Sequence, residues 1–504
     1  MRFSSRALLA VCLLAGFPVL ILALVAGLVV LEIYAIGHSP FGAVKLAIFT
    51  VPAGYALIRG LFELERHRAN EESGVLVTPE TQPELWALVR GLAAEVGTRP
   101  PDDIRLVPAV NAAVAEETRL LGLRAVRRHL YVGAPLLAGL NTGELRAVLA
   151  HELAHYSNQD TRLAGLTYRG ERTMRGTLAR LDPSDWFQRL VRRLFVAYAK
   201  LYFKVSRAVT RRQELAADAA SGRIAGPATA AGALRQIGAL DTAWRFFVNN
   251  YATIGWQAGF LPRRFAEGFG LLLADSTRQA ELDRIRANPD EEESPYDTHP
   301  SMAARIAALD GMPPVPATPG DERPAREILR DTEAVLDAAM QADLVEEAKR
   351  KQRVDWPTLI DHGCRHRLAT ISAGIFAEAE RALGRPATLN TLLDAVDAGR
   401  FTVLADPDSR AADGAGPRAR REFAATSARP RLTTVLQNAL ADAGHARWTL
   451  SWSDSAKLTL TPPFDTELEP AMDAAFDGDT APLRTLLGKA EISLAYQPLV
   501  PTPA

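Results

Sequence analysis

His151-Glu152-Leu153-Ala154-His155, an H-E-x-x-H pattern, is the stretch from which the rest of this sequence is best interpreted. Residues four apart stand one above the other on a helix, so His151 and His155 can both direct a ring nitrogen at one ion. Glu152 is rotated away from these ligands but can still take a proton from water beside that ion. The pattern therefore predicts a zinc site with a general base. The alternative is a core helix that carries two histidines by chance.

The residues before this pattern are typical of a helix start. Asn141 can act as the N-cap, and Glu144 follows at the spacing of a capping box. Apolar residues then recur at helical spacing, so we expect one helix that carries both histidines.

A second helix can supply a third ligand. Residues 211–219 are rich in alanine and place Glu214 and Asp218 one turn apart. We expect Glu214 to bind the ion and Asp218 to accept the second ring N–H of His151, because zinc-bound histidines usually donate that proton to a carboxylate or carbonyl. Two histidines and one carboxylate leave a position open, which is typical of hydrolytic zinc and not of a closed structural site. The alternative is that both acids are solvated beside arginines.

Four segments in this order resemble the membrane zinc metallopeptidases that include the CaaX prenyl protease and the bacterial stress protease HtpX. The resemblance covers about residues 75–310 and is closer to the HtpX-like members. The matching segments are Asn111-Ala112-Ala113, residues 145–155, the pair Glu214 and Asp218, and Thr298-His299-Pro300-Ser301 with Arg305.

The resemblance implies roles for residues that composition and spacing leave unexplained. It implies that Asn111, Ala112 and Ala113 form an edge strand to which a substrate peptide is added as a further strand. It also implies that His299 helps to stabilise the oxyanion of the tetrahedral intermediate, with Arg305 as a nearby positive support.

The expected fold is mainly α with a small β-sheet, an α+β zincin-like metalloprotease domain. Short strand-like runs at residues 104–110, 111–116 and 129–132 predict the sheet beside the zinc helix.

Two apolar runs predict an N-terminal transmembrane helical hairpin over residues 1–68. The first, from about residue 7 to 36, is about 45 Å long as a helix and exceeds the ~30 Å hydrocarbon core, so we expect a retained anchor and no cleaved signal peptide. The second runs from about residue 43 to 61, and a buried core helix is its alternative. Arginines precede the first run and follow the second, which predicts that both ends lie in the cytoplasm. We therefore expect a plasma-membrane protein with two spans and a cytoplasmic catalytic domain.

Residues 186–207 form an amphipathic pattern with basic residues on one side and aliphatic and aromatic residues on the other. Such a helix can lie on an anionic leaflet or pack its apolar side on the protease core. The sequence leaves both alternatives open.

The chain has 504 residues, which predicts several domains. We expect a metallopeptidase domain at 69–312, a Pro-rich linker at 313–325 and an accessory α+β module at 326–504, with a mobile segment near 405–430. His362, Cys364 and His366 lie close in sequence but are better explained as polar residues of a helix than as metal ligands. The module carries no recognisable chemistry and is expected to bind a protein partner or substrate.

Charge and cysteine content exclude other classes. Lys and Arg total 58 against 59 Asp and Glu, so no global charge favours nucleic acid. Two cysteines imply no disulfide framework.

These observations predict a membrane-anchored endopeptidase with one Zn²⁺ per chain that cleaves protein or peptide substrates in or near the lipid bilayer, in an HtpX-like quality-control role. One alternative is a membrane scaffold with a structural zinc site, against which Glu152 counts. Another is CaaX-type processing, for which two spans are too few to enclose the site.

Overall fold

The computed structural model describes residues 5–66, 74–119, 124–156, 186–289, 300–316, 321–406 and 416–499. The chain divides into two compact units, residues 1–242 with 281–343, and residues 243–280 with 344–504. Residues 243–280, which we expected in the metallopeptidase domain, therefore lie in the second unit. Residues 326–343, which we expected in the accessory module, lie in the first.

The first unit contains a four-stranded sheet in the order β1-β2-β4-β3. Its strands are β1 (Val75–Val77), β2 (Asp103–Val107), β3 (Ala112–Arg119) and β4 (Arg124–Gly133). β2 and β4 are parallel, whereas β1 and β3 run antiparallel to their neighbours. Alternate residues such as Ile104, Leu106, Leu130 and Val132 are fully buried, so one face of the sheet belongs to the core. The three expected strands are present with shifted ends, and β3 lies at the edge of the sheet.

The zinc-pattern helix is α5 (Thr142–Ala154), and it packs against α3 (Pro83–Val96). Asn141 and Glu144 form the expected capping box, because each side chain bonds the backbone N–H of the other residue. Residues 321–323, which belong to the expected linker at 313–325, also contact the first turn of α5. The Thr142 and Gly143 N–H groups donate to the carbonyls of Arg323 and Asp321, at 2.7 and 2.9 Å. The first turn of α5 therefore has its backbone donors satisfied from outside the helix.

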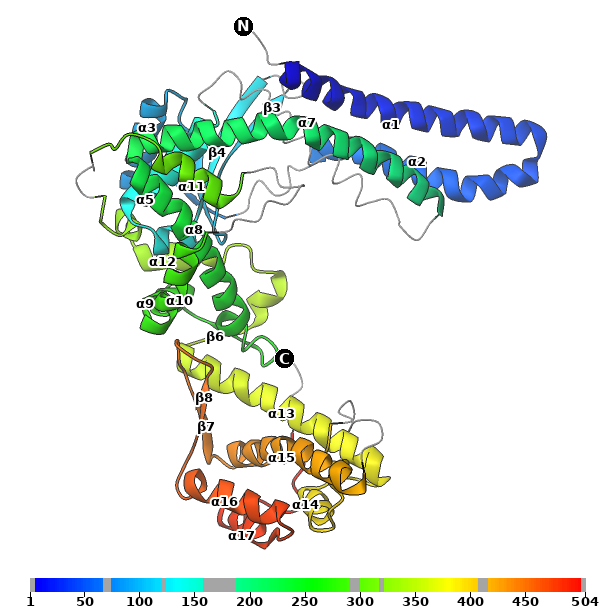
Figure 1. The fold of residues 1–504 in the computed structure, drawn as a ribbon, viewed down its shortest axis with the longest axis vertical. Helices are drawn as coiled ribbons and strands as arrows, with labels where there is room; N and C mark the ends of the chain where they lie inside the picture. Colours follow the sequence, from blue (N-terminus) through cyan, green and yellow to red (C-terminus); the bar gives the residue numbers. More distant parts are fainter. Residues whose placement is uncertain are drawn as a thin grey trace. The chain divides into compact units, whose positions relative to one another are not determined.

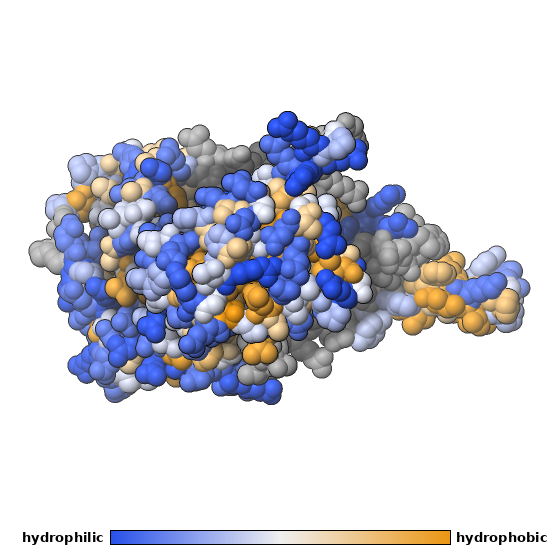
Figure 2. Space-filling model, turned by 90° about the horizontal axis from the view of Figure 1, so that it is seen from below, coloured by the Kyte–Doolittle hydropathy of each residue, from blue (hydrophilic) through white to orange (hydrophobic). Residues whose placement is uncertain are grey.

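The N-terminal helices α1 (Ser5–His38) and α2 (Pro40–Arg66) lie side by side and antiparallel (Figure 1). Within α1, Gly16–His38 is long and apolar enough to cross a membrane. Among the described residues it is the one helix that meets this test, because the apolar part of α2, Pro40–Pro52, is shorter. In Figure 2, hydrophobic residues gather over these two helices at the right of the view. The structure thus supports one candidate span, and the predicted second span remains a prediction.

The longest helix is α7 (Trp186–Ala225), and its two halves have different neighbours. In the first half, Phe195 and Tyr202 are fully buried against Phe17 of α1 and Leu57 of α2. The second half packs on α5. The basic amphipathic stretch therefore packs part of its apolar side on the N-terminal helices, a partner that neither sequence interpretation included.

The first unit is completed by α4 (Ala134–Gly139), α11 (Met302–Asp310), η3 (Ala325–Ile328) and α12 (Thr332–Met340). Helices α8 (Pro227–Phe247) and α10 (Ser276–Ala287) contain the points at which the two units are divided.

The second unit is mainly helical, with α13 packed on α15. Trp244, Phe247, Phe269 and Trp356 form an aromatic cluster there with ring centroids 5.1–5.6 Å apart, so these aromatic residues are core. Its elements are η2 (Val248–Ala252), β5 (Phe260–Pro262), α9 (Phe265–Ala274), η4 (Glu346–Arg350), β6 (Gln352–Val354), α13 (Trp356–Leu383), α14 (Leu389–Asp397), η5 (Phe401–Val403), α15 (Pro417–Asp442), β7 (Ala446–Thr449), β8 (Lys457–Leu460), α16 (Phe464–Phe476) and α17 (Ala481–Lys489).

Within the segment near 405–430 that we expected to be mobile, residues from Pro417 onwards form α15. Proline suits the first turn of a helix, where its missing N–H costs nothing, and alanines and arginines that favour helix follow it. Strands β7 and β8 pair antiparallel, which gives this module the β part of its expected α+β composition. Cys364 is buried within α13, and no metal-ligand group includes it among the residues that the structure describes.

Candidate metal centre

His151 and His155 project from the same side of α5, as their spacing predicts. Their Nε2 atoms lie 3.2 Å apart, and the two rings meet edge to face with centroids 4.8 Å apart. His155 is the C-cap of α5 and still has helical backbone angles. Its side chain therefore lies one turn from that of His151 on the same face of the helix.

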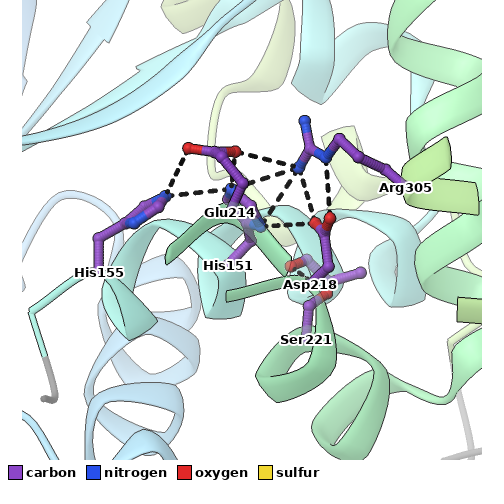
Figure 3. A network of polar contacts seen from close by, with 7 residues as sticks. His151, His155, Glu214, Asp218, Ser221 and Arg305 are labelled. Carbon is purple, nitrogen blue, oxygen red and sulfur yellow. Dashed lines mark hydrogen bonds and ion pairs between the residues drawn. The ribbon is translucent and has the colours of Figure 1, made fainter. Parts of the chain in front are cut away.

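Glu214 approaches the two histidines from α7 (Figure 3). One carboxylate oxygen lies 3.6 Å from His155 Nε2, and the other lies 3.6 Å from His151 Nε2. The Glu214 side chain is only 6% exposed. These three residues are the one group with metal-ligand geometry among the described residues.

The spacing of the donor atoms fits zinc. Ligand atoms about 2.0–2.1 Å from a tetrahedral ion lie about 3.3 Å from one another. The two Nε2 atoms are 3.2 Å apart, each lies 3.6 Å from a different oxygen of Glu214, and one donor atom from each residue can be chosen so that all three lie within 4.8 Å of one another. Two imidazoles and a carboxylate are also a donor set that zinc binds in hydrolytic enzymes. The residues present therefore fit the ion that the sequence predicts.

Asp218 and Arg305 lie together on one side of His151. Asp218 Oδ1 lies 2.9 Å from His151 Nδ1, which leaves the Nε2 side of the ring for the other ligands. Arg305 of α11 donates to both Asp218 oxygens, at 2.7 and 2.8 Å, and lies 3.7 Å from Glu214. This arginine therefore holds the carboxylate that orients His151.

The charges of these groups shift their pKa values. Burial lowers the pKa of His151, but bonds to Asp218 and Glu214, with the nearby charge of Glu152, outweigh burial and raise it to about 9. Burial raises the pKa of Asp218, but Arg305 and then His151 outweigh it, so this pKa lies below its usual value. In the metal-free protein, His151 therefore carries a proton at neutral pH. Zinc must displace that proton when it binds.

Glu152, the expected general base, follows His151 on α5 and is partly buried. Its negative charge contributes to the raised pKa of His151. Glu152 is thus the acidic residue next to the first ligand in the chain, on the helix that carries both histidines.

The other expected site residues are placed as follows. Asn111 is exposed and immediately precedes β3, while Ala112 and Ala113 begin that edge strand. His299 lies outside the described residues. Arg305 was expected as a positive support near the oxyanion, and the structure shows its guanidinium bonded to Asp218.

Ser221 is a site residue that sequence reasoning missed. Its buried hydroxyl donates to the Ala147 carbonyl at 2.8 Å, which joins α7 to α5 one turn from Asp218 and one turn from His151. The only sequence signal was its position three residues after Asp218, on the same side of the helix.

Residues 79–313 match a family model, described as Peptidase family M48. No curated protein and no solved structure matches the chain. M48 peptidases are zinc metallopeptidases, and the cluster of His151, His155 and Glu214 lies within the matched segment. The family match and the geometry of this cluster together support the assignment of residues 79–313 to the M48 metallopeptidases.

Proposed function

We propose that this chain is a membrane-anchored zinc endopeptidase that cleaves proteins in or beside the membrane, in an HtpX-like role. The observation that carries the proposal is the cluster of His151, His155 and Glu214, whose donor atoms lie within 4.8 Å of one another, with Glu152 next to His151 in the chain. A structural site would have no use for that adjacent carboxylate.

His151, His155 and Glu214 would hold the ion, and Asp218 with Arg305 would fix the orientation of His151. When bound, zinc supplies Lewis acidity, which polarises a carbonyl group and makes water more acidic. Glu152 takes a proton from the attacking water and then gives it to the leaving amine. The edge strand β3 holds the substrate peptide in extended form near these groups.

The packing of α7 supports a site near the membrane. Tyr202 packs with the apolar residues of α1 and α2, and Glu214 follows twelve residues later (214 − 202) on the same helix. At 1.5 Å per residue this is about 18 Å along the helix. If α1 anchors the chain, α7 keeps the site close to the bilayer, where membrane-associated substrates are available. Two spans and a cytoplasmic catalytic unit are part of this proposal.

Glu152→Gln tests the proposal. The purified variant should keep its zinc and lose cleavage of casein by at least about 100-fold, because a positioned general base contributes about 10²–10⁴-fold. Glu333→Gln changes an exposed glutamate of the same unit and serves as control. Parent-like cleavage by Glu152→Gln would disprove the role of Glu152, and full activity after removal of zinc would reject the metal mechanism. A parent protein that binds zinc but cuts nothing would favour a scaffold.

A further inference from the structure

The edge strand β3 has two kinds of backbone position. The Gly133 N–H donates to the Asn111 carbonyl at 2.8 Å, so these two residues form a hydrogen-bonded pair. In an antiparallel ladder such pairs alternate with non-bonded pairs. Ala113, which is paired with Tyr131, therefore directs its backbone groups at β4. Ala112 and Val114 direct their N–H and C=O groups away from β4, toward the outer edge of the sheet.

One of these outward carbonyls accepts a hydrogen bond from a side chain that adjoins the metal centre in the sequence. The hydroxyl of Tyr156, the residue directly after His155, donates to the Val114 carbonyl at 2.5 Å. The Tyr156 ring is held in place by its surroundings. The Arg128 guanidinium lies 4.9 Å from the ring centroid, and the Thr98 hydroxyl donates to the Tyr156 carbonyl at 3.1 Å.

We infer that Tyr156 is a positioning residue that sets the register of the substrate peptide on β3. This inference rests on the proposed function. A peptide added to β3 bonds the outward groups of Ala112 and the N–H of Val114, but the Tyr156 hydroxyl takes the place of the peptide N–H at the Val114 carbonyl. The paired stretch then ends at Val114. Because Tyr156 adjoins the ligand His155, this end fixes which amide reaches Glu152.

Tyr156→Phe removes the hydroxyl and keeps the ring. The Val114 carbonyl can then accept a hydrogen bond from a peptide N–H. The paired stretch between the peptide and β3 can therefore extend by two residues. Since outward groups recur every two residues, casein should yield additional fragments cut two residues from the parent sites, detected by mass spectrometry. A peptide spanning one parent site should also bind about 2- to 10-fold more tightly to Glu152→Gln/Tyr156→Phe than to Glu152→Gln, from one added hydrogen bond.

Tyr198→Phe is the matched control, because the Tyr198 hydroxyl also donates to a backbone carbonyl at 2.5 Å, that of Leu13 in α1. It should leave the fragments unchanged. Identical fragments and identical peptide affinity for Tyr156→Phe would overturn the inference. If the parent cleaves casein and Glu152→Gln does not, that result leaves the proposed function intact.

Hydrogen exchange gives a second measurement that does not depend on the folding of Tyr156→Phe. When the peptide binds Glu152→Gln, the outward amides of Ala112 and Val114 should exchange more slowly. The amide of Ala113 should change little, because it already faces β4. Slowing at Ala113 alone, or at none of the three amides, would show that the peptide does not pair with β3 in this register.

Discussion

Asp218→Asn is the substitution that most directly tests how the metal centre is built. Asp218 is 3% exposed and is the carboxylate shared by His151, at 2.9 Å, and by both donors of Arg305, at 2.7 and 2.8 Å. The amide keeps the shape of the side chain and removes its charge. Arg305, whose side chain is 12% exposed, then keeps the Glu214 carboxylate at 3.7 Å as a neighbouring charge.

Two effects of known size follow. Removing one partner of a buried ion pair costs about 3–5 kcal/mol of unfolding free energy, because the other charge stays buried without it. Loss of the carboxylate behind a ligating histidine weakens metal binding by about 10- to 100-fold. We therefore expect the zinc-free variant to unfold at lower denaturant concentration, and the zinc-bound variant to lose metal to a weaker chelator than the parent does.

Asp310→Asn is the control for this prediction. Asp310 pairs with Arg235 at 3.5 Å, but its side chain is 54% exposed, so its loss should cost less than about 1 kcal/mol. Denaturant titration and chelator competition on both variants, in the same detergent, give the comparison. If Asp218→Asn bound zinc within twofold of the parent and unfolded like Asp310→Asn, the account of the Asp218–Arg305 pair as a support for His151 would be refuted.

Two further predictions concern pH and the α7 contact. The pKa of His151 is raised from about 6.5 in the unfolded chain to about 9, so in zinc-free protein its stabilising effect of about 3 kcal/mol is complete below pH 6.5 and is lost as pH rises through 9. Urea unfolding at pH 6, 7.5 and 9 should show this fall in the free energy of unfolding. Zinc should abolish the His151 contribution, because a ligating histidine carries no proton. A free energy of unfolding that did not change with pH in the zinc-free protein would contradict this prediction. The Phe195 ring is fully buried and lies edge to face with Phe17, so Phe195→Ala should lower the free energy of unfolding by about 3–5 kcal/mol and lower the Tm of the solubilised protein. Leu201 is 51% exposed on the same helix, and Leu201→Ala should change the Tm little. Equal Tm shifts for the two variants would show that this packing is not maintained.

Local patterns in the sequence predicted much of the site because each rests on a short, regular geometry. The spacing of His151 and His155 needs only a helix, and the capping box at Asn141 and Glu144 marks where that helix begins. Asp218 follows Glu214 by one turn, so both reach the same place once α7 lies against α5. The structure brings these residues together as the patterns indicated.

Contacts between distant segments could not be predicted in the same way. Nothing in the pattern around Ser221 indicates that its hydroxyl bonds Ala147, because that contact depends on how α7 crosses α5. The same limit applies to Phe195, whose apolar side could face lipid or protein equally well by composition. Only the fold shows that it faces Phe17. Tyr156 was passed over because a tyrosine after the motif is unremarkable until the edge of β3 is placed beside it.

The chain just beyond the family match completes the start of the helix that bears the metal ligands. The carbonyls of Asp321 and Arg323 satisfy the first amides of α5, and the Arg330 backbone bonds the Gln82 side chain through both its N–H and its C=O. A protein shortened after Pro313 would therefore lose part of its own catalytic helix cap, although every residue of the family segment would remain. We therefore expect that a fragment which keeps this helix start intact has to extend past residue 330.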